Sequence, residues 1–142
     1  MPQLTPEKLE QLREAATAAA KHAYAPYSGF RVGAALLLSD GSIVTGCNVE
    51  NISYGLTICA ERSAVVRAIA ESGLKRKIAA VAVTNLEGAA SPPCGACRQV
   101  LGEFVTQDAL VYFADGKGGM TAVPFAELLP HSFSDWKSDA RH

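Results

Sequence analysis

The sequence has no long block of charge of one sign and no long hydrophobic run. It carries 13 basic and 14 acidic residues among 142, a formal net charge of −1. It therefore lacks the basic excess typical of proteins that bind nucleic acid polymers. The longest apolar stretch near the middle, VGAALLL (32–38), is too short to span a bilayer, so no membrane partner is expected. The beginning, MPQLTPEKLEQL, lacks the basic segment and apolar run of a secretory signal, which predicts a cytoplasmic location.

Cysteine is also scarce, with four residues at positions 47, 59, 94 and 97. In a reducing compartment a disulfide framework is not expected, and cysteines there more often bind metal, react or pack. Taken alone, Cys94 and Cys97 in PPCGACRQ (92–99) fit a redox pair, half of a zinc site or a disulfide staple. The choice depends on which other residues can join them.

The length and the helix and strand patterns predict one α/β domain, residues 1–142, with a polar tail over 130–142. Thr5 is a good N-cap with Pro6 behind it, and Asp40-Gly41 predicts a hairpin turn. The predicted helices span residues 6–22, 59–71, 94–104 and 124–129. The predicted strands span residues 30–38, 42–50, 77–85, 109–114 and 120–123. This alternation predicts a three-layer α/β/α fold around a five-stranded mixed sheet, with its first two strands antiparallel and helices on both faces.

Three cysteines lie where predicted helices begin: Cys59 opens one, and Cys94 and Cys97 open the next. Helices that follow neighbouring parallel strands can start close together, and helix N-termini favour thiolates. Structural zinc sites use four protein ligands, whereas catalytic sites usually keep three and leave one position for water. Cys47 lies in a predicted strand, and no histidine has an obvious ligand spacing. Three cysteines and a water molecule therefore indicate a catalytic zinc site.

Charged residues beside Cys59 support this interpretation. Three thiolates leave a divalent zinc site with a formal charge of −1, which a nearby cation would offset. Arg62, one turn after Cys59, is placed to supply it, and Arg98 is a weaker candidate. Glu61 could take a proton from zinc-bound water and deliver it to a substrate nitrogen. This glutamate, followed by P-C-x-x-C, matches the signature of zinc nucleobase deaminases.

The chain resembles the cytidine deaminase family over residues 6–133. The matching segments are FRVGAALL (30–37), GCNVEN (46–51), TICAER (57–62) and PPCGACRQ (92–99). ELLP (127–130) with Phe133 behind it is similar to the family's C-terminal pattern. The resemblance implies zinc-dependent hydrolysis of cytidine and deoxycytidine to uridine and deoxyuridine with release of ammonia, as in pyrimidine salvage.

The resemblance also implies roles for individual residues. Cys59, Cys94 and Cys97 would be the ligands of one Zn²⁺ per chain, and Glu61 the proton shuttle. Arg62 would contact the thiolate sulfurs. Four positions would bind the nucleoside: Phe30 beside it, Asn48 and Glu50 on the ribose, and the Ala60 backbone N–H at the pyrimidine carbonyl. Short family members with three cysteine ligands are typically homotetramers, in which Tyr54 and Phe133 would reach a neighbour's site.

Other interpretations stay open at this stage. Asn48 and Glu50 could form turns, and Phe30, Tyr54 and Phe133 could be ordinary packing residues. A related zinc deaminase with another substrate, a non-catalytic zinc module and a thiol oxidoreductase are the competing functions. A polynucleotide editor is disfavoured, because no basic, aromatic-rich groove for a strand is evident.

Overall fold

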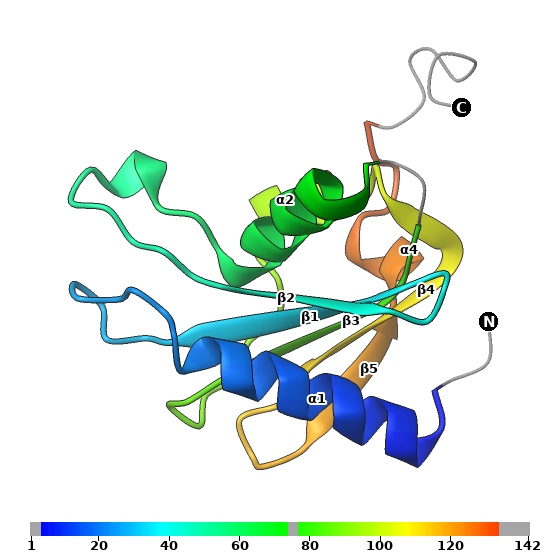
Figure 1. Ribbon diagram of the computed structural model, residues 1–142, viewed down its shortest axis with the longest axis horizontal. Helices are drawn as coiled ribbons and strands as arrows, with labels where there is room; N and C mark the ends of the chain where they lie inside the picture. Colours follow the sequence, from blue (N-terminus) through cyan, green and yellow to red (C-terminus); the bar gives the residue numbers. More distant parts are fainter. Residues whose placement is uncertain (1–3, 74–76, 134–142) are drawn as a thin grey trace.

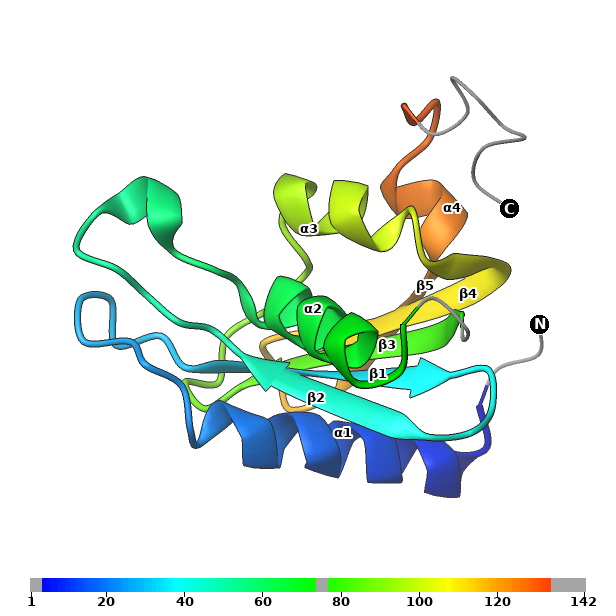
Figure 2. The same ribbon diagram turned by 45° about the horizontal axis from the view of Figure 1, so that its top comes forward.

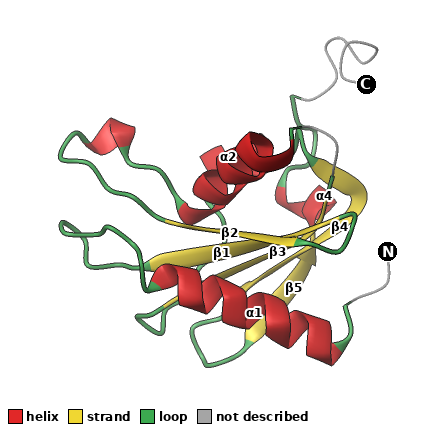
Figure 3. Cartoon of the chain, in the orientation of Figure 1, coloured by secondary structure: helices red, strands yellow, loops and turns green. Residues whose placement is uncertain are grey.

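The computed structural model describes residues 4–73 and 77–133, in which helices are interspersed with single strands and pairs of strands (Figures 1 and 3). The helices are α1 (Pro6–Ala20), the short 3₁₀ helix η1 (Tyr54–Leu56), α2 (Ala60–Ser72), α3 (Gly95–Leu101) and α4 (Phe125–Leu128). The strands are β1 (Val32–Leu38), β2 (Ile43–Cys47), β3 (Ile78–Asn85), β4 (Val105–Ala114) and β5 (Met120–Pro124). As predicted, the Thr5 side chain caps α1 by accepting a hydrogen bond from the backbone N–H of Lys8.

The five strands form one mixed sheet in the order β2-β1-β3-β4-β5. β1 pairs antiparallel with both β2 and β3, β3 pairs parallel with β4, and β5 pairs antiparallel with β4. The predicted mixed sheet with an antiparallel first pair is confirmed. One premise was wrong: β2 and β3, which precede the cysteine-bearing helices, are not neighbours, because β1 lies between them. They still run in the same direction, so α2 and α3 both start near the same end of the sheet.

Helices cover both faces of the sheet, as predicted. α1 lies on one face, and α2, α3 and α4 lie on the other (Figures 1 and 2). Under α1, Leu12 and Ala16 pack against Ala35 and Ala80 of the sheet. The two faces therefore have separate hydrophobic clusters.

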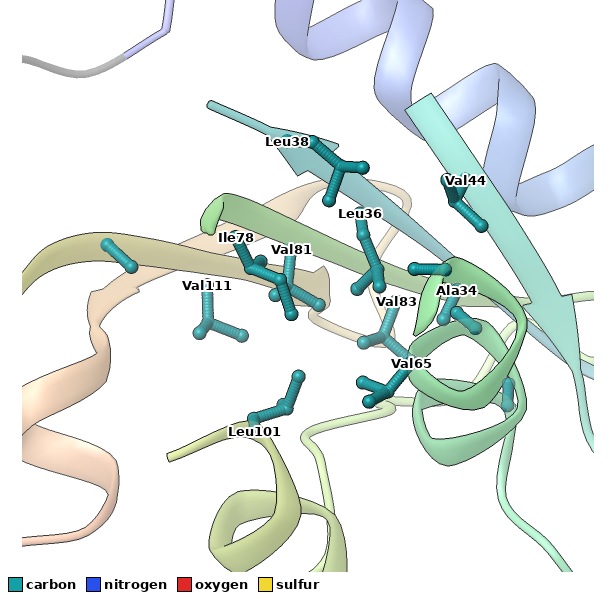
Figure 4. Close-up of a cluster of buried hydrophobic side chains, with 14 of the residues drawn as sticks. Ala34, Leu36, Leu38, Val44, Val65, Ile78, Val81, Val83, Leu101 and Val111 are labelled. Atoms are coloured by element: carbon teal, nitrogen blue, oxygen red, sulfur yellow. The ribbon is translucent and has the colours of Figure 1, made fainter. Parts of the chain in front are cut away.

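The cluster beneath α2 and α3 fixes the helices that carry the cysteines. Leu36 of β1 and Val83 of β3 meet Val65 of α2 and Leu101 of α3 (Figure 4). Val65 is 2% exposed and the other three side chains at most 1%, so each buries nearly all of its apolar surface. This packing fixes both helices against the sheet, through the second turn of α2 and the end of α3.

Several predicted boundaries were wrong for identifiable reasons. β2 ends at Cys47 rather than at residue 50, because the next residues leave the sheet to bond the loop before β1. α3 ends at Leu101, and Gly102 caps it. β4 begins at Val105, four residues early, because Val105 pairs with Ile78 despite the polar residues that follow. The predicted loop after β2 contains η1.

Of the predicted tail, residues 134–142 lie outside the described residues. Within residues 4–73 and 77–133, no helix is both long and apolar enough to cross a membrane.

Two loops project from one end of the sheet (Figures 1 and 2), and we call them together the arm: residues 21–31 and 48–59. Tyr24 exchanges backbone hydrogen bonds with this second loop, donating to the Asn48 carbonyl over 3.0 Å and accepting from the Glu50 N–H over 2.8 Å. Val49 and Ile58 exchange two more, each 2.9 Å long. The bonds of Tyr24 tie the two loops together, and those between Val49 and Ile58 close the second loop on itself.

Candidate active site

A pocket of about 240 Å³ opens where the arm meets the starts of α2 and α3. It lies beyond the carboxyl ends of β2 and β3, the usual place for a ligand in an open α/β sheet. Its lining residues come from five segments of the chain: Phe30, Val32, Asn48, Thr57, Cys59, Ala60, Glu61, Val83, Ala90, Ser91, Pro92 and Cys94. Six predicted site residues are therefore part of one pocket wall.

The sulfur atoms of Cys59, Cys94 and Cys97 lie within 4.8 Å of one another at one side of this pocket. The Sγ atoms of Cys94 and Cys97 are 3.4 Å apart, and those of Cys59 and Cys94 are 3.7 Å apart. Zinc binds thiolate sulfur at about 2.3 Å, so a tetrahedral site places its sulfurs about 3.8 Å apart. The three cysteines fit one zinc ion. Cys47 lies in β2 and belongs to no such cluster among the described residues.

The pKa values of the cysteine thiols in this cluster favour the binding of a cation. A hydrogen bond from Cys97, with a further contribution from Arg62, lowers the pKa of Cys59 to about 5. The same hydrogen bond, together with burial, raises the pKa of Cys97. One thiolate therefore forms readily, while its neighbour keeps its proton. A zinc ion would take the place of that proton, since metal binding requires deprotonated sulfur.

Arg62 supplies positive charge to the cluster from the first turn of α2. Its Nη2 donates to Cys59 Sγ over 3.7 Å and to the Thr57 carbonyl over 3.3 Å. Its Nε is buried and has no hydrogen-bond partner among the described residues. By contrast, the Arg98 side chain donates to two backbone carbonyls. Arg62 is therefore the cation that directly contacts a sulfur.

Glu61 is the buried acid of the pocket, with only 4% of its surface exposed. Burial is the main cause that raises the pKa of its carboxyl to about 7, and the neighbouring Cys59 adds to this effect. A general acid–base group works best when its pKa is near the operating pH. Glu61 can therefore both accept and return a proton near neutrality.

Phe30 reaches the pocket from the first arm loop, and Asn48 holds it there. The Asn48 side-chain amide donates to the Phe30 carbonyl over 2.7 Å, and its oxygen accepts from the Val32 N–H over 2.9 Å. Asn48 is buried and lines the pocket. Because an amide group has two N–H donors and an oxygen with two lone pairs, hydrogen-bonding capacity remains for a ligand.

Glu50 is buried behind the pocket and does not line it. Its carboxylate accepts hydrogen bonds from the Tyr27 and Ser28 backbone N–H groups and from the Ser28 hydroxyl. These bonds, led by that of the hydroxyl, lower the pKa of Glu50. Glu50 thus anchors the first arm loop as a carboxylate.

The remaining predicted residues divide into two groups. Ala60 is fully buried and is the first residue of α2, where helical N–H groups lack partners within their own helix. Tyr54 and Phe133 are 78% and 71% exposed and do not line the pocket of their own chain. Any contribution from these two would have to be made to another copy.

Six further pocket residues were not predicted from the sequence. Thr57 and Pro92 fall inside the TICAER and PPCGACRQ motifs, which could have suggested them. Ser91 is buried, and its hydroxyl donates to the Val83 carbonyl over 3.2 Å, which holds the loop before Cys94 against the sheet. Val32 falls inside the FRVGAALL motif, whereas Val83 and Ala90 lie in no motif, and only the fold brings those two to the pocket.

Comparison with known proteins identifies related chains. Residues 6–114 match the family model described as "Cytidine and deoxycytidylate deaminase zinc-binding region". A cytidine deaminase of Halalkalibacterium halodurans is 46% identical over 125 residues, covering 88% of this chain and 93% of that protein. A cytidine deaminase of Mycobacterium tuberculosis is 54% identical over 100 residues, covering 70% of this chain and 74% of the other.

Solved structures show the same fold. The crystal structure of a cytidine deaminase from Burkholderia pseudomallei has a TM-score of 0.80 at 44% identity, covering 92% of this chain and 100% of that one. That of a cytidine deaminase from Mycobacterium tuberculosis has a TM-score of 0.77 at 43% identity, covering 89% and 97% respectively.

Proposed function

The chain belongs to the family of cytidine and deoxycytidylate deaminases, and on that premise we propose that it hydrolyses cytidine and deoxycytidine to uridine and deoxyuridine with release of ammonia. The observation that carries the proposal is a buried glutamate, Glu61, in the same pocket wall as a three-cysteine cluster. A structural zinc site would have a fourth protein ligand. It would also have no use for a buried acid beside the metal. We propose that residues 1–142 act as one catalytic domain.

The chemistry is divided between the metal and the side chains. A zinc ion, which Cys59, Cys94 and Cys97 would hold, would supply a water molecule whose lowered pKa makes it a nucleophile at neutral pH. Glu61 accepts the proton of that water and gives it to the ring nitrogen N3 of the base. The water oxygen bonds to C4 of the ring, Glu61 carries the second proton of that water to the amino group, and the bond between C4 and the amino nitrogen breaks to release ammonia. Arg62 compensates the negative charge of the three sulfurs.

The nucleoside is recognised by pocket residues from the first arm loop, from the end of β2 and from the start of α2. Phe30 offers an apolar surface to the ligand, and the Ala60 N–H offers a donor to the pyrimidine carbonyl. Asn48 supplies the hydrogen bonds to the ribose, together with Glu50 behind it. An unpaired buried polar group is costly, so this pair favours a nucleoside over a free base. No nucleic acid polymer and no membrane takes part.

The test follows the ultraviolet absorbance of cytidine incubated with purified, zinc-analysed protein. Cytidine should be converted to uridine, with loss of conversion after zinc is removed by a chelator and recovery when zinc is returned. Protein that contains zinc but converts neither cytidine nor deoxycytidine would refute the proposal. Cytosine is the matched control, because it offers no ribose to Asn48 or Glu50.

We further propose that the enzyme is a homotetramer in the cytoplasm and serves pyrimidine salvage. The arm supports self-association, because it exposes a group of large apolar side chains, including Tyr54 and Leu56 at 78% and 66%. Contiguous exposed apolar surface of this kind marks protein interfaces. The Phe133 side chain, exposed beside α3, would complete a neighbour's pocket together with Tyr54.

The assembly is tested by light scattering of Leu56→Asp, with Gln107→Asp as control. Both place a charge at an exposed position, but Gln107 lies on β4, and β4 begins at the end of the sheet away from the arm. We expect Leu56→Asp to have a lower molar mass in solution and lower activity than the wild type. Gln107→Asp should have the molar mass and the activity of the wild type. A wild-type chain of monomeric mass would refute the assembly and leave the chemistry open to its own test.

A further inference from the structure

Arg98 connects two distant segments of the chain from one turn after Cys94. Its Nε donates to the Pro93 carbonyl over 2.8 Å, and its Nη1 donates to the Leu128 carbonyl over 3.2 Å. These two carbonyls are the acceptors of its side chain among the described residues. A guanidinium is a rigid planar group, so two such bonds fix the relative positions of both acceptors.

The first acceptor belongs to the residue that leads into the zinc cluster. Pro93 is almost completely buried. Cys94 is the N-cap of α3, and its carbonyl accepts the first helical hydrogen bond, from the Arg98 N–H over 2.9 Å. The Pro93 carbonyl lies one residue earlier and has no place in the helical pattern. A buried carbonyl needs a partner, and Arg98 supplies it immediately before a metal ligand.

The second acceptor belongs to the segment that ends at Phe133. Leu128 is the last residue of α4, where helical carbonyls lack partners within the helix. The side chain of Gln99, next to Arg98, donates from Nε2 to the Phe133 carbonyl over 3.1 Å. Two consecutive residues of α3 therefore hold both ends of the segment 128–133. The same short helix carries Cys97.

We propose that Arg98 is a positioning residue that locks the Pro93–Cys94 turn of the zinc cluster to the C-terminal segment. The lock keeps Cys94 in place to bind zinc, and with Gln99 it sets the position of Phe133 relative to the metal. The part that concerns Phe133 rests on the proposed function. The part that concerns zinc does not, because it can be measured without substrate.

The test compares the zinc-loaded variants Arg98→Met, Arg98→Lys and Gln99→Ala with the wild type. The first readout is the rate at which zinc passes to a chromophoric chelator, well below the unfolding temperature. The second is kcat and KM for cytidine, measured separately. Arg67→Met is the matched control, because Arg67 also donates to a backbone carbonyl, that of Thr45 over 3.3 Å, from the exposed side of α2.

We expect Arg98→Met to release zinc about 10–100-fold faster than the wild type, the size of effect found when groups that support metal ligands are removed. We also expect the fold decrease in its kcat to exceed the fold increase in its KM. Arg98→Lys should restore little of the wild-type zinc retention, because a single ammonium nitrogen cannot reproduce the two donor positions of a planar guanidinium. Gln99→Ala should raise KM and leave zinc release unchanged.

Zinc release at the wild-type rate in Arg98→Met, or equal acceleration in Arg67→Met, would overturn the zinc part. An unchanged KM in Gln99→Ala would overturn the link to Phe133. A wild type that deaminates no cytidine while Arg98→Met still releases zinc faster would refute the proposed function and leave the positioning role intact.

Discussion

The side-chain amide of Asn48 bridges the end of the first arm loop and the start of β1, donating to the Phe30 carbonyl over 2.7 Å. Its oxygen accepts from the Val32 N–H over 2.9 Å, so the amide occupies the place that a neighbouring strand would otherwise take. β2 stops at Cys47 for this reason, and the same residue both shapes and lines the pocket. Under the proposed function, this one side chain would combine a structural role with a substrate-binding role.

Replacing Asn48 with Ala should affect both roles. We expect a loss of about 1–3 kcal/mol in the free energy of unfolding, because buried backbone groups lose their partners. We also expect KM for cytidine to rise more than kcat falls. Measuring 2′,3′-dideoxycytidine in parallel isolates the ribose contact, since a substrate without the hydroxyl should be less sensitive to the substitution. Equal sensitivity of both substrates would argue for a purely structural role, and Asn51→Ala on the same loop serves as control.

Replacing Glu61 with Gln should abolish turnover without removing the metal. The amide has nearly the same shape but cannot carry a proton, so kcat should fall by about 10²–10⁴-fold. Zinc content, measured by metal analysis, should stay at one ion per chain. Glu87→Gln is the control, because Glu87 pairs with Arg31 at the surface. A Glu61→Gln enzyme with substantial activity would show that another group moves the proton.

Cysteine substitutions should separate the zinc ligands from the fourth cysteine. Cys59→Ala, Cys94→Ala and Cys97→Ala each remove one sulfur from the cluster, so purified protein should contain little zinc and have no activity. Cys47→Ala should keep both, because its side chain lies in β2 outside the cluster. Full zinc occupancy in any of the first three variants, by metal analysis, would exclude that residue as a required ligand.

Much of this arrangement could be predicted from the sequence, because the patterns concerned are local. Helix-capping residues, glycine-containing turns and the spacing of apolar residues predict most helices and strands. The helix starts at Cys59 and Cys94 follow from the same features. What could not be predicted depends on distant partners. The end of β2 depends on hydrogen bonds between Asn48 and the backbone of Phe30 and Val32, 16 or more residues earlier. The bond of Arg98 to Leu128 joins residues 30 apart, and no local pattern encodes either contact.

The close approach of α2 to the sheet depends on Gly46. A Cβ atom at this position would lie 2.4 Å from the Ala64 nitrogen and 2.8 Å from the Ala60 carbonyl oxygen. Gly46→Ala would therefore push away the helix turn that carries Glu61. We expect a loss of about 3 kcal/mol or more in urea unfolding, at the upper end of overpacking costs, together with reduced activity. Gly55→Ala, where nothing in the chain lies within 4 Å of the added atom, should cost far less stability, and equal stability of the two variants would contradict this packing.

The anchoring of Glu50 by Ser28 should appear in the pH dependence of stability. The hydrogen bond from the Ser28 hydroxyl is the largest cause that lowers the pKa of Glu50 from its ordinary value of 4.5. A carboxyl whose pKa is lower in the folded state stabilises the fold above its unfolded pKa, and this stabilisation is lost as the pH falls through the folded value. Ser28→Ala should therefore be less stable than the wild type at pH 6–7, with the difference shrinking below about pH 4.

Urea unfolding of the wild type, Ser28→Ala and Glu50→Gln between pH 3 and 7 provides the measurement. Glu50→Gln has no carboxyl to titrate, so it should lose this component of the pH dependence altogether. Ser53→Ala, on the second arm loop, should follow the wild type. If the free energy of unfolding of Ser28→Ala differed from that of the wild type by the same amount at every pH from 3 to 7, the hydroxyl would stabilise the loop without acting through the ionised carboxylate. A difference in the free energy of unfolding that narrows with acidity would establish that the ionised Glu50 carboxylate anchors the loop that bears Phe30.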